Sequence, residues 1–184
     1  MTGDAIRTGA ADHAIGRRPA RPALYTPEER ARRDATRWTL VQGLLAPFQF
    51  LIFLVSLGLV LRSLATGEGA FAADMSVVAK TITLMTIMIT GSIWEKVVFG
   101  KWLFARAFFW EDVFSMLVIA LHATYMVMLL GGFGSFAQRM EIALAGYAAY
   151  VINAGQFLLK LRAARLEGAG PKRDRSAHLQ GASA

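Results

Sequence analysis

Three carboxyl groups occur close together in the sequence, on either side of a short basic segment that separates two long apolar stretches. Glu95 follows a tryptophan in "GSIWEKVVFG", and Glu111 and Asp112 follow another in "AFFWEDVF". An ionisable side chain in an apolar membrane segment costs several kcal/mol, so its presence indicates either a function or a partner. Burial disfavours the charged form of a carboxyl group, which could then stay protonated and act as a general acid. Glu95, Glu111 and Asp112 are therefore candidate catalytic residues.

The same three residues also have a purely structural explanation. Acidic side chains in the first turn of a helix stabilise the helix dipole, which would account for Glu111 and Asp112. Lys96 and Arg106 lie in the same region of the sequence and could simply pair with Glu95 or Glu111. The residue types alone leave both explanations open.

A histidine lies deeper in the apolar stretch that begins with Glu111. His122 follows Glu111 by eleven residues, about three helical turns and roughly 16 Å, so the two share one face and His122 falls near mid-bilayer. A lone histidine in such a segment can be a ligand or a hydrogen-bond donor between helices. The other two histidines, His13 and His178, lie near the chain ends, and there is no cysteine. This pattern excludes a bis-histidine haem, and we predict no metal site of the protein's own.

Polar residues also occur in the other apolar stretches, where they fall on common helical faces. They indicate an interior that is not purely hydrocarbon, although the same side chains could serve only to join helices by hydrogen bonds. The residues concerned are Gln42, Gln49, Thr83, Thr86, Thr90, Gly146, Tyr150, Asn153, Gln156 and Lys160.

All four tryptophans fall at one boundary of the apolar stretches. They are Trp38, Trp94, Trp102 and Trp110. Tryptophan anchors helices at the membrane interface, but belts of tryptophan usually form on both sides. The one-sided distribution therefore suggests either simple anchoring or an added task, such as holding a flat aromatic ligand.

Four segments are long and apolar enough to cross a bilayer, at about 39–61, 76–99, 113–130 and 142–161. Hydrophobic residues make up 55% of the 184 residues, and the mean hydropathy is +0.42. Backbone polar groups in lipid must be satisfied within each segment, which requires helices. The sequence therefore predicts an all-α, integral membrane four-helix bundle over residues 25–166.

Basic residues flank these segments unevenly. Most lie before the first segment, between the second and third, and after the fourth, which places both termini and the middle loop in the cytoplasm. The net charge of +7 fits cations that meet anionic lipid, and we expect no nucleic-acid partner. Thr26, Pro27 and Glu29 predict the start of a basic helix on the membrane surface. Residues 1–24 and 167–184 are predicted to be a disordered extension and a flexible basic tail.

Four stretches of the sequence are similar to a known family. They are "LYTPEERARRDATRWTLVQGLLAPFQFLIFLVSLGLVLR", "GSIWEKVVFGKWLF", "AFFWEDVFSMLVIALHATY" and "YAAYVINAGQFLLKLRAARLE". Together they resemble the 3-vinyl bacteriochlorophyllide hydratase family, over Leu24 to Glu167. The resemblance implies a multi-pass lyase of the bacterial inner membrane, cytoplasmic or intracytoplasmic. Such an enzyme adds water to the 3-vinyl group of a chlorophyllide-type pigment, giving a 1-hydroxyethyl group, in bacteriochlorophyll synthesis.

This resemblance suggests roles for the candidate residues. Hydration involves no redox change, so the tetrapyrrole substrate and water suffice and no cofactor is expected. Glu111 or Glu95 would protonate the vinyl group, and Asp112 would activate the water. His122 would be either an axial ligand to the pigment's magnesium or an internal hydrogen-bond donor. Trp94 and Trp110 would stack on the macrocycle, and Asn153 and Gln156 would bind ring carbonyls or a water. The propionate would pair with Lys96, Lys101 or Arg106.

Two other functions are compatible with the same residues. A non-enzymatic membrane pigment carrier or assembly factor would share a cavity lined by these polar residues, the tryptophans, and the basic residues Lys96, Lys101 and Arg106 at its edge. A structural membrane subunit would use the polar faces only to pack helices. Membrane lipid and other enzymes of the pigment pathway are the remaining expected partners.

Overall fold

The computed structural model describes residues 24–168, and this part of the chain is all-helical, without a strand. Five helices follow one another along the chain: α1 (Pro27–Ala35), α2 (Arg37–Thr66), α3 (Ala70–Phe99), α4 (Phe109–Gly131) and α5 (Phe136–Gly168). The predicted tail begins at residue 167, but α5 continues to Gly168. The rest of the two predicted terminal segments lies outside the described residues.

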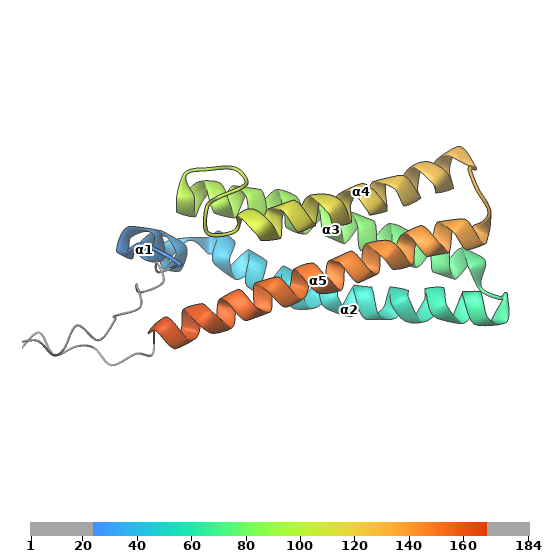
Figure 1. Ribbon diagram of the computed structural model, residues 1–184, viewed down its shortest axis with the longest axis horizontal. Coiled ribbons are helices and arrows are strands. Elements are labelled where there is room, and N and C mark those ends of the chain that lie inside the picture. The colour runs from blue at the N-terminus through green and yellow to red at the C-terminus, as the bar shows by residue number, and fades with distance from the viewer. Residues whose placement is uncertain (1–23, 169–184) are drawn as a thin grey trace, which may run out of the picture.

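The four long helices pack side by side as a bundle (Figure 1). Contacts join α2 to α3, α3 to α4, α4 to α5 and α5 to α2, so the helices follow chain order around the bundle. Each of the four is long and apolar enough to cross a membrane. The four predicted membrane segments each lie within one of these helices, which confirms the all-helical, four-segment fold. The exact membrane boundaries along each helix stay a prediction.

Both described ends of the chain lie at the same end of the bundle as the segment that connects α3 to α4 (Figure 1). We refer to that segment, residues 100–108, as the 100–108 loop. The opposite end holds the short connections between α2 and α3 and between α4 and α5. Gly67, Gly100 and Gly132 end their helices in the left-handed conformation, which glycine adopts without steric cost.

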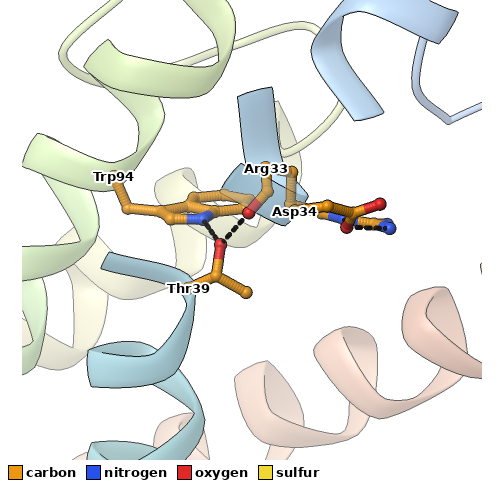
Figure 2. Close-up of polar contacts among 4 residues, drawn as sticks. All are labelled: Arg33, Asp34, Thr39 and Trp94. Atoms are coloured by element: carbon orange, nitrogen blue, oxygen red, sulfur yellow. Dashed lines mark hydrogen bonds and ion pairs between the residues drawn. The ribbon is translucent and has the colours of Figure 1, made fainter. Parts of the chain in front are cut away.

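The first helix is fixed to the bundle by a few specific contacts. Thr26 and Glu29 form the predicted capping box at the start of α1. The Arg32 side chain donates a hydrogen bond to the Val98 carbonyl, over 2.8 Å from Nε. Figure 2 shows that the Thr39 hydroxyl accepts from the indole of Trp94 at 2.9 Å and donates to the Arg33 carbonyl at 2.6 Å. These bonds join α1, α2 and α3 at one end of the bundle.

The distribution of residues is the reverse of that in a water-soluble protein. Large apolar side chains face outward, with Leu44 65%, Leu130 79% and Leu158 67% exposed. Polar and charged side chains are buried between the helices instead, among them Gln49, Ser56, Lys80, Ser115 and His122. Because soluble proteins expose few such apolar surfaces, this arrangement fits a bundle surrounded by lipid.

Candidate active site

The three predicted carboxyl groups come together beneath the 100–108 loop. Glu95 lies in the last turns of α3, and Glu111 and Asp112 lie in the first turn of α4. They are 5%, 4% and 4% exposed, so each is buried despite lying near a helix end. The loop reverses the chain between α3 and α4 and thereby places these carboxyl groups in one region. We call Glu95, Glu111 and Asp112 the carboxyl cluster.

The backbone of the 100–108 loop holds two members of the carboxyl cluster. The Phe104 N–H donates to Asp112 Oδ2 at 2.6 Å, and the Ala105 N–H donates to Glu95 Oε2 at 3.2 Å. Phe104 has a φ of +59°, a left-handed conformation that a bulky residue rarely adopts. Successive N–H groups around such a residue form a concave site for anions. Glu95 and Asp112 thus accept from the N–H groups of consecutive loop residues, which places their two carboxyl groups side by side.

Glu111 is in a different electrostatic environment from the other two carboxyl groups. Lys160 of α5 forms an ion pair with it, with 2.6 Å between Nζ and Oε2, and also donates to the Ala107 carbonyl. The expected partners of the cluster, Lys96 and Arg106, form no ion pair within the described residues. Lys96 is exposed and donates to the Gly100 carbonyl at 3.0 Å. The sequence left open a pairing of Lys96 or Arg106 with Glu95 or Glu111, and the described residues do not show it. The polar face of α5 reaches the carboxyl groups instead.

The two tryptophans that precede the carboxyl groups have different surroundings. Trp94 is half-buried, bonded to Thr39, and packed edge-on against Phe99 and Phe108. Trp110 is 65% exposed and meets Phe109 edge-on. Trp94 therefore has a clear structural role at the junction with α1, whereas the ring of Trp110 lies on the outer surface.

Tyr25 completes the aromatic contacts at this end of the bundle. Its ring stacks on Phe99, and the guanidinium of Arg33 lies 4.7 Å from its centroid. Burial raises the pKa of the Tyr25 hydroxyl, against the opposing effect of the Arg33 charge. Tyr25, two residues before α1, is therefore part of the packed structure around the site.

A second set of polar groups lies one to two turns deeper in the bundle. Asn153 donates to the Ser115 hydroxyl at 2.8 Å, which joins α5 to α4. The side-chain oxygens of Asn153 and Gln156 are buried and have no hydrogen-bond partner in the described part of the chain. Both predicted residues therefore face the interior, on the side of α5 that also carries Lys160.

His122 is deeper still and does not join the carboxyl cluster. It shares the buried face of α4 with Glu111, as predicted, but lies about 16 Å of helix rise away. Its Nδ1 lies 2.8 Å from the Val118 carbonyl, and its Nε2 is buried without a partner. A carbonyl can only accept, so Nδ1 carries the hydrogen and Nε2 is a free acceptor on the neutral ring. Gly146 of α5 makes room for this ring, since a Cβ there would lie 3.0 Å from Cε1.

Two buried features with ionisable groups were not predicted from the sequence. Lys80 of α3 is fully buried, with its Nζ 3.6 Å from the centre of the Tyr150 ring. At the opposite end of the bundle, Asp74 accepts from Tyr125 at 2.5 Å and pairs with Arg139 at 3.2 Å. A lysine inside the apolar run "SVVAKTITLM" was the signal available for Lys80, because ionisable residues within membrane segments are rare.

No group of three or more histidine, aspartate or glutamate side chains within residues 24–168 is arranged to hold a metal ion. The carboxyl cluster holds two neighbouring carboxyl groups and a carboxylate–ammonium pair, and the imidazole of His122 lies deeper in the bundle. This set can donate and accept protons and can stabilise a developing positive charge.

Fold and site together define a class, a multi-pass helical membrane protein with buried acid–base groups at one end of its bundle. A family model described as 2-vinyl bacteriochlorophyllide hydratase matches residues 25–163. A 2-vinyl bacteriochlorophyllide hydratase of Cereibacter sphaeroides is 68% identical over 151 residues, covering 81% of this chain and 94% of that protein. A protein of the same name from Rhodobacter capsulatus is 67% identical over 151 residues, covering 82% of this chain and 88% of that protein.

The chain therefore belongs to the 2-vinyl bacteriochlorophyllide hydratase family. This confirms the predicted family, and the labels 2-vinyl and 3-vinyl differ only in how the ring position is numbered. No solved structure matches the chain.

Proposed function

We propose that this protein hydrates the vinyl group of a chlorophyllide-type pigment to a 1-hydroxyethyl group in bacteriochlorophyll synthesis. The observation that carries the proposal is the family match, which extends from Tyr25 ahead of α1 to Ala163 in α5 and so includes every residue of the candidate site. The lipid-facing exterior suits a flat, apolar substrate. The buried carboxyl groups suit a reaction that needs one proton donor and one proton acceptor.

The reaction can be written with the neighbouring pair Glu95 and Asp112. Glu95 transfers its proton to the terminal vinyl carbon, and positive charge develops on the inner carbon, where the conjugated ring delocalises it. Water attacks the inner carbon and loses a proton to Asp112. Because the two carboxyl groups are neighbours, the proton can return from Asp112 to Glu95 and reset the site. One proton is donated and one accepted, so the product differs from the substrate by one water.

The ion pair assigns a different role to Glu111. The carboxyl group of Glu111 is engaged by the ammonium of Lys160, with 2.6 Å between Oε2 and Nζ, so it is less available for proton transfer to a substrate. It is better suited to stabilise the positive charge that develops on the substrate. Of the two residues considered as the acid, the geometry therefore favours Glu95.

The remaining site residues contribute to substrate binding in this proposal. The free Nε2 of His122 is an acceptor suited to the magnesium of the pigment, and its bond to Val118 fixes the ring orientation that a metal ligand needs. The unpartnered oxygens of Asn153 and Gln156 suit a bound water. Trp110 offers an exposed face for stacking, while Lys96, Lys101 and Arg106 supply cations for the propionate at the rim.

We place the protein in the inner membrane of a bacterium, with the carboxyl cluster and both chain ends on the cytoplasmic side. The basis is the excess of basic residues at that end of the bundle. The basic helix α1 would then lie on the membrane surface, where the pigment can enter between the helices. Neighbouring enzymes of the pigment pathway would meet the same face.

The function is tested by incubating membranes that contain the full chain with a vinyl chlorophyllide. Loss of the vinyl group, followed by absorption and by a mass gain of one water, is expected without any added cofactor. Pigment that is bound but unchanged would indicate a carrier instead. Pigment that is not bound at all would indicate a structural subunit.

A further inference from the structure

The least explained group in the bundle is the ammonium of Lys80. Its side chain is 0% exposed, and its Nζ has no hydrogen-bond partner within the described residues. The three ion pairs found there involve Arg33, Arg139 and Lys160, so no carboxylate neutralises Lys80. The nearby aromatic face of Tyr150, at 3.6 Å, returns only a small part of the cost of burying a charge.

Lys80 is not isolated from other groups that lack a partner. The Tyr150 ring that its Nζ faces lies one helical turn from Tyr147, whose ring centroid is 5.9 Å from that of His122. The Nε2 of His122 also has no partner within the described residues. Together with Tyr150 these residues form what we call the deep polar layer. It offers one acceptor nitrogen and one strong donor, both buried and both unused. Native proteins pair more than nine in ten of their buried polar groups, so two such groups in one layer suggest a missing ligand.

A magnesium-containing tetrapyrrole has the complementary pair of groups. Its metal ion needs a ligand with a lone pair, which Nε2 of His122 can supply, and its rim carries hydrogen-bond acceptor oxygens on a ring ketone and on a propionate. We propose that Lys80 binds one of these rim oxygens when the pigment enters the bundle. The inference rests on the proposed function, because it takes the pigment as the ligand. It adds a binding residue in the interior, distinct from the cations at the rim.

The proposal explains why a costly polar group is kept inside the bundle. A buried amino group without a partner leaves a hydrogen bond unmade in the free bundle, and an acceptor oxygen relieves that penalty only in the complex. Part of the cost of burying Lys80 is thereby converted into affinity for the pigment. Replacing Lys80 should then weaken binding while stabilising the free protein.

The test uses the full chain in lipid nanodiscs and measures pigment affinity by fluorescence, separately from turnover. Lys80→Met keeps an unbranched side chain, one atom shorter, and removes the donor. It should bind a vinyl chlorophyllide about 10- to 100-fold more weakly, the usual effect of losing a hydrogen bond to a charged group. The control is Arg62→Met, which removes an exposed cation near the C-terminal end of α2. This variant should bind the pigment like the wild type.

Two modified pigments identify the oxygen. The methyl ester removes the propionate charge, and reduction of the ring ketone removes the carbonyl. The wild type should bind one of these modified pigments more weakly than the unmodified chlorophyllide. Lys80→Met should bind that modified pigment and the unmodified chlorophyllide with equal affinity. The inference is wrong if Lys80→Met still distinguishes both modified pigments from the parent pigment. In that case, loss of the preference for the free propionate in Lys96→Met would assign the propionate to Lys96 instead.

Thermal unfolding shows whether weaker binding has a trivial cause. Lys80→Met should unfold at a higher temperature than the wild type, since an unpaired buried charge has been replaced by an apolar group. A variant that unfolds at a lower temperature, or that binds all three pigments like the wild type, would overturn the inference. If the wild type hydrates the vinyl group and Lys80→Met binds the pigment with normal affinity, the proposed function stands and only this inference is overturned. A wild-type chain that binds no pigment would contradict the proposed function as well.

Discussion

The ion pair between Lys160 and Glu111 divides the carboxyl cluster into two parts with different chemistry. Glu111 has a cation at 2.6 Å, whereas Glu95 and Asp112 have each other and two backbone N–H groups. A pair of adjacent carboxyl groups titrates as a unit, with one proton shared between them. The division therefore separates the groups that exchange protons from the group that carries a fixed charge.

The stability of this arrangement can be tested with Lys160→Met. The change leaves Glu111 buried without its cation and should lower the free energy of unfolding by about 3 kcal/mol, the lower end of the range for a broken buried pair. The low end applies because the Lys160 side chain is 25% exposed. Denaturation in detergent measures the loss. The double variant Glu111→Gln, Lys160→Met should recover most of it, and an unchanged loss in the double variant would contradict the pairing.

The residue types at the site were predictable, but their partners were not. Glu95, Glu111 and Asp112 are conspicuous because an apolar chain rarely carries three acids at one bend. Their contact with Phe104 N–H, Ala105 N–H and Lys160 depends on the path of a loop and on a helix fifty residues away. Lys80 stands out within an apolar run, but its burial against the Tyr150 ring depends on how α3 and α5 meet.

At the scale of the elements, the close approach of α4 and α5 depends on one glycine. A Cβ at Gly146 would lie 3.0 Å from Cε1 and 3.1 Å from Nδ1 of His122, closer than most real contacts. Gly146→Ala should therefore lower the unfolding temperature, although alanine is intrinsically the better helix former by about 1 kcal/mol. The same change in a His122→Ala background should raise it, because the clash is gone.

The matched control for this prediction is Gly58→Ala in α2. No atom lies within 4 Å of a Cβ at that position, so the change should be neutral or slightly stabilising. If Gly146→Ala behaves like Gly58→Ala in the wild-type background, the close packing of His122 against α5 is not as described.

The 100–108 loop is the second element on which the site depends. Phe104 adopts φ +59°, which costs a non-glycine residue about 1–2 kcal/mol, and its N–H binds Asp112 at 2.6 Å. Phe104→Gly should relieve this strain while keeping the N–H, so hydration activity should survive. Phe104→Pro removes the N–H and cannot adopt a positive φ, so it should abolish activity. Equal activity of the two variants, measured as the rate of vinyl loss, would rule out the role of the loop.

At the scale of the whole molecule, the fold follows from composition more directly than the site does. Four apolar stretches of about twenty residues have few alternatives to membrane helices, because each must satisfy its own backbone groups in lipid. The order of helices around the bundle could not be predicted from the same pattern. It depends on which polar faces meet. Asn153 of α5 bonds to Ser115 of α4 at 2.8 Å, and Tyr147 of α5 bonds to Ser56 of α2 at 2.5 Å.

The proposed orientation makes a prediction for the intact membrane. The chain has no cysteine, so a single cysteine can be introduced by Lys101→Cys in the 100–108 loop or by Glu68→Cys between α2 and α3. In intact cells, a membrane-impermeant maleimide that enters the periplasm should label the second variant and leave the first unlabelled. Inverted vesicles should give the opposite result. Labelling of Lys101→Cys in intact cells would place the carboxyl cluster on the other side of the membrane.

The most direct test of the account is the rate of vinyl hydration in ¹⁸O-labelled water by the wild type and by Glu95→Gln. The wild type should yield a hydroxyethyl product carrying one ¹⁸O, and Glu95→Gln should be slower by about 10²–10⁴-fold at equal protein level, the range for loss of a positioned acid or base. Glu141→Gln, an exposed carboxyl on α5, serves as the matched control with normal activity. A Glu95→Gln chain that hydrates the pigment at the wild-type rate would contradict the central claim.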